Sequence, residues 1–381
     1  MSKILIATTE LNRIGGMASH AQNTAMELQR RGWEVHCLAT NVRGDYFDEL
    51  SRHYTCHDLS SVRLSPKKVF MAADVANSVN PDIILMNNCA LMHYALPLIN
   101  ANIKPIAVLH SDDERFYAIA SLFGRRVFRW ISPSPCVATR FEKFVGGHHN
   151  RISLIPHGVD QRNYVAHESK KSDSRFEILF VGFLGESKGA DLLPPIFAQV
   201  ERRIPNVFLS IVGEGPLRGS LEAEFAKLNL HKKIRIYGPT PPEKISDLMT
   251  SAHLLLHPTN LEGFGLVIIE AMMCGTVPVV SKLAGVTDQI VQDGETGLLV
   301  TPLDVEGFAR AIITLHSDSN LYRSMSGKAQ HAAVENFSLD RMMNQYEELF
   351  GKTDDRPERK KRTVPGWYLE AATQYLRKRV Q

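Results

Sequence analysis

The chain has 381 residues, of which 44% are hydrophobic, and this length favours two domains with separate cores over a single one. Its 44 lysine and arginine residues nearly balance 41 aspartate and glutamate residues, so the overall charge does not indicate a nucleic-acid-binding protein. Five dispersed cysteines without a Cys-x-x-Cys pair indicate reduced thiols rather than a disulfide framework.

The first half of the chain alternates short apolar runs with helical patterns. A Gly-Gly loop at Gly15 and Gly16 lies between the first apolar run and a helical pattern over Ala18–Arg30. Short apolar strands between helices indicate a parallel sheet covered on both faces. The first apolar run, Ile4–Ala7, is too short for a signal-peptide core, and no apolar run approaches the length of a transmembrane helix, so we expect a cytoplasmic protein. The predicted strands are Lys3–Thr8, Glu34–Thr40, Ile83–Met86, Ile106–His110 and Ile152–Ile155.

The same alternation restarts after a polar segment over residues 165–175, which has the composition of a linker. We therefore predict an α/β protein with two Rossmann-like doubly wound domains, residues 1–165 and 166–336, that face each other across a cleft. The strands predicted in the second domain are Phe176–Val181, Val207–Val212, Ile234–Tyr237, His253–His257 and Val277–Ser281. Helices are predicted over Leu192–Arg203, Leu217–Leu228 and Val267–Cys274.

The C-terminal part of the chain is amphipathic and basic. Residues 337–350 predict a helix that crosses back to the first domain, and residues 351–381 form a tail. Nine basic and four acidic residues give this tail a charge of +5, which leaves −2 for the rest of the chain. Basic clusters within residues 360–381, together with an aromatic and aliphatic stripe, fit binding to an anionic membrane surface. The alternatives are packing on the first domain and a solvated tail.

The segment from Pro258 to Val280 is the most informative part of the sequence. It contains the end of a strand, a loop with Gly263 and Gly265, a short helix, a glycine stop and a new strand. The glycines allow the backbone to approach a ligand, and the free N–H groups at the start of the helix suit a phosphate. Glu270 lies among apolar residues of this helix and needs a partner there. Two ribose hydroxyls would serve, and so would a cap or a salt bridge within the domain.

These motifs, in their order and spacing, resemble the retaining GT-B glycosyltransferases of family 4, also called group 1. The resemblance extends to about Phe350 and is strongest in Glu262–x7–Glu270 followed by Ala-Met-x-Cys-Gly-x-Pro-Val-Val. The further matching motifs are Gly15-Gly16, Ile155-Pro-His-Gly-Val-Asp160, Phe180-Val-Gly with Lys188-Gly189, Val212-Gly-Glu-Gly-Pro216 and Asp293-Gly-x-x-Gly-Leu-Leu-Val300.

The resemblance implies a set of donor contacts in the second half of the chain. Glu270 would hold the ribose hydroxyls of a nucleotide diphosphate sugar, and Glu262 would contact the transferred sugar. The backbone of Phe264, Gly265 and Leu266 would meet the distal phosphate.

Further roles fall on Lys188 and on the first half of the chain. Lys188 would pair with the diphosphate, whose charge grows as the sugar departs. Gly15 and Gly16 would let the N-terminal loop close over phosphate and acceptor. His110 would lie near the donor sugar and, with Lys188 and Glu262, would be catalytic. The alternative interpretation of His110 is structural: a polar side chain at a strand end that forms hydrogen bonds with Asp112 or Asp113 and takes no part in catalysis.

One position departs from the family pattern. Many relatives have arginine directly after the Phe-Val-Gly strand, and this chain has Phe183. Phenylalanine cannot pair with a phosphate, and losing a charge-assisted hydrogen bond costs about 1.5–3 kcal/mol if nothing replaces it. Arg218 or Lys282 could supply the missing charge. The substitution also keeps open a relative that binds its ligand without catalysis.

The resulting hypothesis is a retaining hexosyltransferase that moves a sugar from a nucleotide diphosphate sugar to a hydroxyl of a glycan or lipid-linked acceptor. Bacterial surface polysaccharide or lipopolysaccharide synthesis would use such a reaction. The absence of an Asp-x-Asp motif and of a ligand set at metal spacing predicts no cofactor and no metal. The alternatives are a non-catalytic subunit that binds a nucleotide sugar or glycan, and a nucleotide-sugar epimerase of the same architecture.

Overall fold

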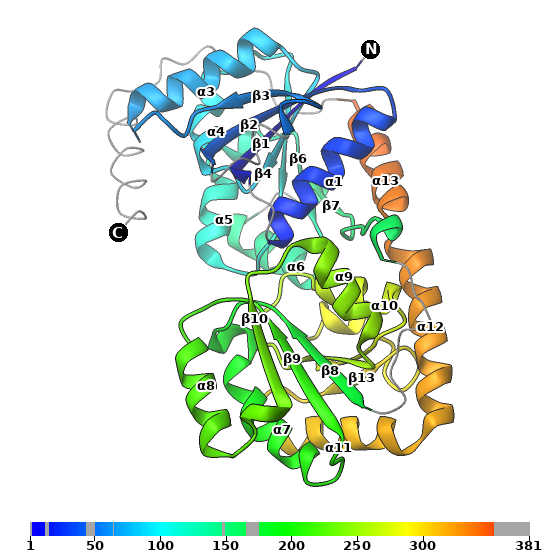
Figure 1. Ribbon diagram of the computed structural model, residues 1–381. Coiled ribbons are helices and arrows are strands. Elements are labelled where there is room, and N and C mark those ends of the chain that lie inside the picture. Colours follow the sequence, from blue (N-terminus) through cyan, green and yellow to red (C-terminus); the bar gives the residue numbers. More distant parts are fainter. Residues whose placement is uncertain are drawn as a thin grey trace. The chain divides into compact units, whose positions relative to one another are not determined.

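The chain forms two compact units in a computed structural model, and each is described by itself (Figure 1). The first unit contains the chain up to Pro156 together with the chain from Met343, and the second runs from His157 to Met342. The structure describes residues 2–11, 15–42, 50–63, 65–146, 149–164 and 175–353. The predicted linker except its last residue, and the basic residues 360–381, lie outside this described part.

The first unit has a seven-stranded sheet in the order β3-β2-β1-β4-β5-β6-β7, with every pair parallel. The prediction of a parallel sheet is therefore confirmed. Two of the strands, β3 and β6, have no counterpart among the predicted ones. The fourth predicted strand, Ile106–His110, is wrong at its end, because the pairing stops at Val108 and His110 lies in the following loop. The strands are β1 (Lys3–Leu11), β2 (Glu34–Val42), β3 (Thr55–Asp58), β4 (Ile83–Asn87), β5 (Lys104–Val108), β6 (Arg129–Ser132) and β7 (Ile152–Leu154).

The strands of this sheet are apolar because both faces of the sheet are buried. All five residues of β4 are buried, which requires cover above and below the sheet. Helix α1 begins directly at Gly16 and buries Ala21, Ala25 and Leu28. The α-helices of this unit are α1 (Gly16–Arg30), α3 (Pro66–Val79), α4 (Ala90–Ala95), α5 (Glu114–Ser121), α6 (Pro135–Val145) and the part of α13 (Leu339–Gly351) from Met343 onward.

The second unit has a six-stranded parallel sheet in the order β10-β9-β8-β11-β12-β13. Its strands are β8 (Phe176–Val181), β9 (Val207–Val212), β10 (Ile234–Gly238), β11 (Leu254–His257), β12 (Val277–Ser281) and β13 (Leu298–Val300). Its α-helices are α7 (Leu193–Glu201), α8 (Arg218–Lys227), α9 (Pro242–Ser251), α10 (Leu266–Met273), α11 (Val305–Ser317) and α12 (Ser319–Phe337). The strands β8, β9 and β12 have the predicted bounds.

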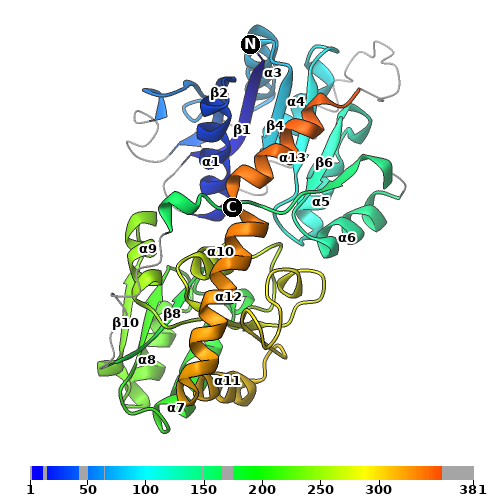
Figure 2. The ribbon, with the colours of Figure 1, turned by 90° about the vertical axis from the view of Figure 1, so that its right-hand side faces the viewer.

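Alternate residues of these strands enter two different cores. Leu254 and Leu256 of β11 pack with α7, α8 and α11, whereas Leu255 packs with α9, α10 and α12 on the other face. In Figure 2, α9 and α10 lie above α7, α8 and α11. Because successive side chains of a strand point to opposite faces, this division shows helices on both sides of the sheet. The doubly wound architecture predicted for this half is confirmed.

The second unit starts earlier than the predicted boundary at residue 166. Val159 forms a bridge with Ser338, and the N–H of Gly158 contacts the sulfur of Met342 at 3.1 Å. A Cβ added at Gly158 would lie 2.7 Å from the Leu339 backbone, so this close approach requires glycine. The Ile-Pro-His-Gly-Val-Asp motif is therefore joined to the chain around residue 339.

Candidate functional site

Each sheet has a point where its strand order reverses, and the residues singled out by the sequence gather there. In doubly wound sheets, ligands bind outside the carboxyl ends of the strands at this point. The second sheet reverses between β8 and β11, and the first between β1 and β4. Lys188 and Glu262 follow β8 and β11, whereas Gly15 follows β1.

Two loops of the second unit are locked together beyond these strand ends. The carbonyl of Ser187 accepts hydrogen bonds from the backbone N–H groups of Asn260 and Leu261, both at 3.0 Å, and from Thr259 Oγ1 at 3.1 Å. Gly189 has a φ of 66°, and a Cβ there would lie 1.9 Å from the Pro258 carbonyl oxygen. The Lys-Gly motif after β8 therefore packs tightly against the loop that precedes Glu262.

This packing brings Lys188 and Glu262 into contact. Lys188 Nζ lies 2.7 Å from Glu262 Oε2 and 3.3 Å from the carbonyl oxygen of Leu261. His257, the last residue of β11, places Nε2 3.1 Å from the same carboxylate oxygen. Burial alone would raise the pKa of Glu262, but the hydrogen bond from His257 and the charge of Lys188 outweigh burial and bring it to about 2. Glu262 is therefore ionised at neutral pH and can only accept hydrogen bonds.

Helix α10 begins at Leu266 with backbone N–H groups that no side chain caps. Its N-cap, Gly265, has a φ of 110°, and a Cβ there would lie 2.9 Å from Ile268 Cδ1. The Phe264 ring is buried and packs edge-on against His157 and Phe337. The Phe264 side chain is thus held in the core, and the phosphate contact expected for the backbone of Phe264, Gly265 and Leu266 stays a prediction.

The partner that Glu270 needs inside the protein is a tyrosine. Burial raises the pKa of Glu270 to about 7, and a hydrogen bond with Tyr164 opposes that shift. Burial and the neighbouring Glu270 carboxyl both raise the pKa of the Tyr164 phenol. A salt bridge, one of the alternatives considered from the sequence, is not among the contacts that shift the pKa of this carboxyl. The Tyr164 hydroxyl uses only part of the accepting capacity of the Glu270 carboxylate, which leaves acceptor positions for ribose hydroxyls. The ribose assignment remains a prediction.

Phe183 is 54% exposed, so its ring does not belong to the core. The two cations that could replace the family arginine differ in their contacts. Arg218 pairs with Glu214 at 2.6 Å and with Glu222 at 3.2 Å. Lys282 is exposed and directly follows β12, the strand next to β11. Within the described residues Lys282 has no ion pair, which makes it the better-placed of the two for a ligand phosphate.

The first unit places His110 in a network of neutral polar groups. Asn87, the last residue of β4, has its Oδ1 2.6 Å from His110 Nε2 and 3.0 Å from His20 Nδ1. His20 Nε2 lies 3.2 Å from the hydroxyl of Tyr346, which is buried on α13. Asp112 and Asp113, the partners considered from the sequence, accept from Tyr117 and Arg140 and cap α5 respectively.

The contacts of Asn87 determine which nitrogens of these histidines carry protons. Its amide nitrogen donates to the carbonyl of Met17 at 2.9 Å, so its oxygen is the acceptor for both rings. His110 therefore carries its proton on Nε2 and His20 on Nδ1. Burial lowers the pKa of His110 well below 6.5, and His20 lowers it further; burial also lowers the pKa of His20 to about 4. Both rings are neutral at pH 7.

The same amide connects His110 to the predicted glycine loop. Met17 follows Gly15 and Gly16 in the first turn of α1, and both glycines are exposed. Gly15 has a φ of 114°, a conformation that other residues rarely adopt. Gly15, Gly16 and His110 are thus brought together through Asn87, a residue that the sequence did not single out. The only signal for it was its place at a strand end.

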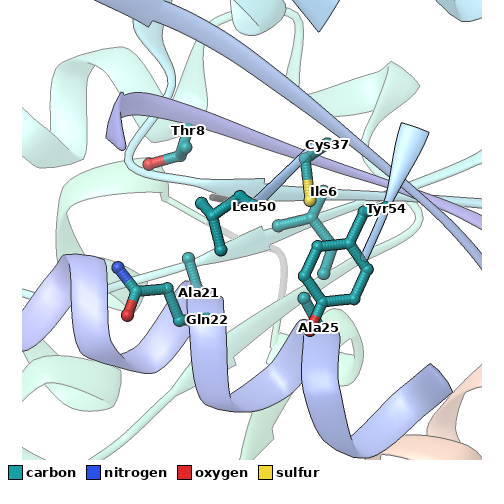
Figure 3. Close-up of a pocket in the computed structure, with 8 residues that line it drawn as sticks. All are labelled: Ile6, Thr8, Ala21, Gln22, Ala25, Cys37, Leu50 and Tyr54. Atoms are coloured by element: carbon teal, nitrogen blue, oxygen red, sulfur yellow. The ribbon is translucent and has the colours of Figure 1, made fainter. Parts of the chain in front are cut away.

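Two small cavities lie within the first unit. One has a volume of about 10 Å³ and is lined by residues of α1, β1 and β2 with Leu50 and Tyr54 (Figure 3). Its accessible lining is wholly apolar, so it offers no chemistry. The other, of about 20 Å³, is lined in part by His110 and by the buried His93. It therefore adjoins the polar network around Asn87.

Neither a membrane-spanning helix nor a metal cluster is found in the part of the chain that the structure describes. There, no helix combines the length and the apolar character needed to cross a bilayer. No group of three or more histidine, cysteine, aspartate or glutamate residues is arranged to hold a metal ion among the same residues.

Two family models match this chain in succession. The model described as Glycosyltransferase Family 4 matches residues 14–163, and the model described as Glycosyl transferases group 1 matches residues 163–332. The first covers the glycine loop and His110, and the second covers Lys188, Glu262 and Glu270. The two matches meet at residue 163, two residues before the start of the linker predicted from the sequence.

Relatives match over nearly the whole chain. N-acetyl-alpha-D-glucosaminyl L-malate synthase of Bacillus anthracis is 24% identical over 387 residues, covering 91% of this chain and 97% of that protein. The structure of Anabaena HepE in complex with UDP and glucose matches with a TM-score of 0.78 at 22% identity, over 91% of this chain and 99% of that one. WaaG, a glycosyltransferase involved in lipopolysaccharide biosynthesis, matches with a TM-score of 0.72 at 17% identity, over 92% and 100%. These likenesses confirm the GT-B fold expected for two Rossmann-like domains.

Proposed function

The chain belongs to the group 1, family 4 glycosyltransferases, and we propose that it transfers a sugar from a nucleotide diphosphate sugar to a hydroxyl group with retention of configuration. The observation that carries this proposal is the contact between Lys188 and Glu262 at the point where the second sheet reverses. A cation and an ionised acceptor lie there side by side. They suit the two parts of such a donor, its diphosphate and its sugar.

The donor would lie along the carboxyl edge of the second sheet. Its distal phosphate would meet the uncapped start of α10 and Lys188, since both offer positive charge. Its sugar hydroxyls would donate to Glu262, and its ribose hydroxyls to Glu270. Two structures of one matched protein support a nucleotide-sugar donor, because HepE was solved with UDP and glucose and with UDP-glucose.

Catalysis would rest on the departure of the diphosphate. The bond between the anomeric carbon and the phosphate oxygen breaks, and the acceptor oxygen bonds to that carbon on the same face. The acceptor proton passes to the leaving diphosphate. Lys188 and the start of α10 stabilise the charge that develops on this group. Neutral His110, held through Nε2 by Asn87, would contact the donor sugar.

Glu262 and Glu270 are not assigned the acid and nucleophile roles of a retaining glycosidase. In those enzymes the two carboxyl groups act on one bond from about 5–5.5 Å apart. Here Lys188 and His257 keep Glu262 ionised. Glu270, on helix α10, instead forms a hydrogen bond with Tyr164. Each carboxyl therefore has its own surroundings and its own part of the donor.

The acceptor is proposed from the relatives and from the tail. WaaG is described as acting in lipopolysaccharide biosynthesis, which favours a glycan or lipid-linked acceptor in bacterial surface polysaccharide synthesis. Basic residues 360–381 would then hold the enzyme at the inner face of an anionic membrane. Sedimentation with anionic and neutral liposomes, using the full chain and a chain ending at Gly351, checks this. We expect salt-sensitive binding of the full chain alone, and equal binding of both would contradict it.

A non-catalytic binding subunit is the competing function, favoured by Phe183 in place of arginine. Incubation with UDP-, GDP- and ADP-sugars and acceptor extracts, followed by measurement of released nucleotide diphosphate, separates the two. The proposed function predicts release by the wild type and its loss in Glu262→Gln. Tight donor binding without turnover would identify a binding subunit, and a changed sugar without release of the nucleotide would identify an epimerase.

The transfer is proposed to need no metal. Chelator should leave the rate of nucleotide diphosphate release unchanged, because Lys188 and the start of α10 supply the positive charge. Loss of transfer on chelation, with recovery on adding a divalent cation, would contradict this part.

A further inference from the structure

His257 contacts the candidate sugar-binding carboxylate, although neither its sequence context nor the family motifs assigned it a role. It ends β11 and is 1% exposed, and its ring centroid lies 6.5 Å from that of Phe180 at an interplanar angle of 30°. Its Nε2 lies 3.1 Å from Glu262 Oε2, and Lys188 Nζ lies 2.7 Å from the same oxygen. A buried histidine on a strand end is thus one of two groups that hold this carboxylate.

The protonation of His257 follows from its other ring nitrogen. Nδ1 is buried and has no hydrogen-bond partner among the described residues. A proton on Nδ1 would leave a buried donor without an acceptor and would set the Nε2 lone pair against the carboxylate. A proton on Nε2 instead makes this nitrogen a donor that faces the carboxylate. His257 therefore donates to Glu262.

Both contacts leave one oxygen of Glu262 available. Of the side-chain hydrogen bonds that reach this carboxylate from the described chain, the two from His257 and Lys188 end on Oε2. The carboxylate cannot rotate freely while His257, at the end of β11, and Lys188, after β8, both hold that oxygen. Oε1 is left to accept from a ligand.

We infer that His257 is a positioning residue, which together with Lys188 holds Oε2 of Glu262 so that Oε1 receives a hydroxyl of the donor sugar. This inference rests on the proposed function of Glu262. It also assigns Lys188 a second role, since the cation proposed for the diphosphate helps to orient the carboxylate. When Lys188 pairs with the diphosphate of the donor, the hydrogen bond from His257 still holds Oε2 of Glu262.

Three substitutions at His257 distinguish the hydrogen bond that Nε2 donates from the packing of the imidazole ring. In His257→Gln the amide nitrogen can take the place of Nε2, whereas in His257→Asn it falls near Nδ1. His257→Phe keeps a ring of similar size without a donor. We expect kcat/KM to fall about tenfold to hundredfold in His257→Phe and His257→Asn, the range for a lost charge-assisted hydrogen bond. His257→Gln should stay within a few-fold of the wild type.

A pH profile tests the positioning role further. Lys188 and His257 are the titratable groups that face Glu262 in the described structure, and both lower its pKa. Removing the His257 donor raises the pKa of Glu262. Because Glu270, with a pKa of about 7, sets the acid limb near neutrality, the variants are compared in a Glu270→Gln background. There the acid limb of kcat/KM should lie at higher pH with His257→Phe than with His257→Gln. Equal kcat/KM and equal acid limbs with and without His257→Phe in this background would overturn the inference.

Binding measurements keep the inference separate from the proposed reaction. Calorimetry with UDP and with UDP-glucose gives the part of the affinity that depends on the sugar. His257→Phe should lose this part and retain UDP affinity, whether or not the wild type turns over. A sugar-dependent part that His257→Phe retains contradicts the inference alone, and a wild type that releases no UDP contradicts only the proposed function.

A matched control is available on the same strand. His253 precedes β11 at its amino end, where its Nδ1 accepts from the N–H of Glu177 at 3.1 Å. His253→Phe removes a histidine from the same sheet without touching the carboxyl edge. It should retain kcat/KM and the sugar-dependent affinity. Thermal unfolding of all variants shows whether a lost activity reflects lost fold.

Discussion

The two sheets present different chemistry at equivalent points. Where the second sheet reverses, an ionised carboxylate, a lysine and the start of a helix lie together. Where the first sheet reverses, two neutral histidines share one amide oxygen. The first arrangement suits a charged diphosphate sugar, and the second suits hydroxyl groups. The same fold therefore supplies different sites through the residues that follow each strand.

The largest expected effect comes from removing the cation of the second unit. Lys188→Ala should lower kcat for nucleotide diphosphate release about 100- to 1000-fold, as for other groups that stabilise charge in a transition state. Lys227→Ala is a matched control, because Lys227 is exposed on α8 and pairs only loosely with Glu224 at 3.5 Å. A large loss of rate in Lys188→Ala, together with a wild-type rate in Lys227→Ala, would support the comparison. Equal rates for the two variants would break it.

The next effect concerns Glu270, whose pKa of about 7 lies above its ordinary value of 4.5. Ribose hydroxyls bind the ionised carboxyl, so the donor KM should rise as pH falls below about 7. Glu270→Gln should raise the donor KM about tenfold or more at pH 8 and remove this pH dependence. Initial rates at varied donor concentration between pH 5.5 and 8.5 measure both. A pH-independent KM in the wild type would rule out this role.

The same substitution should stabilise the protein. Between pH 4.5 and about 7 folded Glu270 keeps a proton that the unfolded chain has lost, so its folded state loses stability as pH rises through this window. At pH 8 this amounts to about 3 kcal/mol, which Glu270→Gln would recover. Thermal unfolding at pH 5 and pH 8 should show a gain confined to the higher pH.

A smaller effect is expected in the first unit. Asn87→Leu removes the acceptor that orients His110 and should lower kcat about tenfold, the cost of one lost hydrogen bond in a positioned group. Asn87→Asp keeps an acceptor but adds charge, which should raise the pKa of both His20 and His110. Histidine titration by NMR checks the shift. A His110 that titrates alike in wild type and Asn87→Asp would contradict the network.

The smallest effect tests the departure from the family pattern. Phe183→Arg places a cation after β8 and should lower the donor KM by up to about tenfold, if the phosphate contact is restored. Phe183 is exposed, so the change should leave unfolding temperature nearly unchanged. Lys282→Ala in the wild type should raise the donor KM if Lys282 already supplies that charge, and the arginine should then compensate in the double variant.

Sequence alone determined the class of fold and the order of its motifs. Apolar runs such as Phe176–Val181 and Val207–Val212 are continuous and bounded by turns, and the structure keeps their predicted ends. Short or polar strands such as β3 and β6 carry little periodic signal, since pairing with their neighbours and not their own residues makes them strands. The glycine loops and the Glu-x7-Glu pair were visible because they are local in the chain.

Only the tertiary structure decided the partners of these motifs. The contact between Lys188 and Glu262 joins residues that lie far apart in the sequence, and the donor role of His257 depends on which ring nitrogen is buried without a partner. Tyr164 beside Glu270 and Asn87 between two histidines are likewise products of packing. Hydrogen bonds and pKa values depend on distances of a few ångströms, which the sequence specifies only through the complete fold.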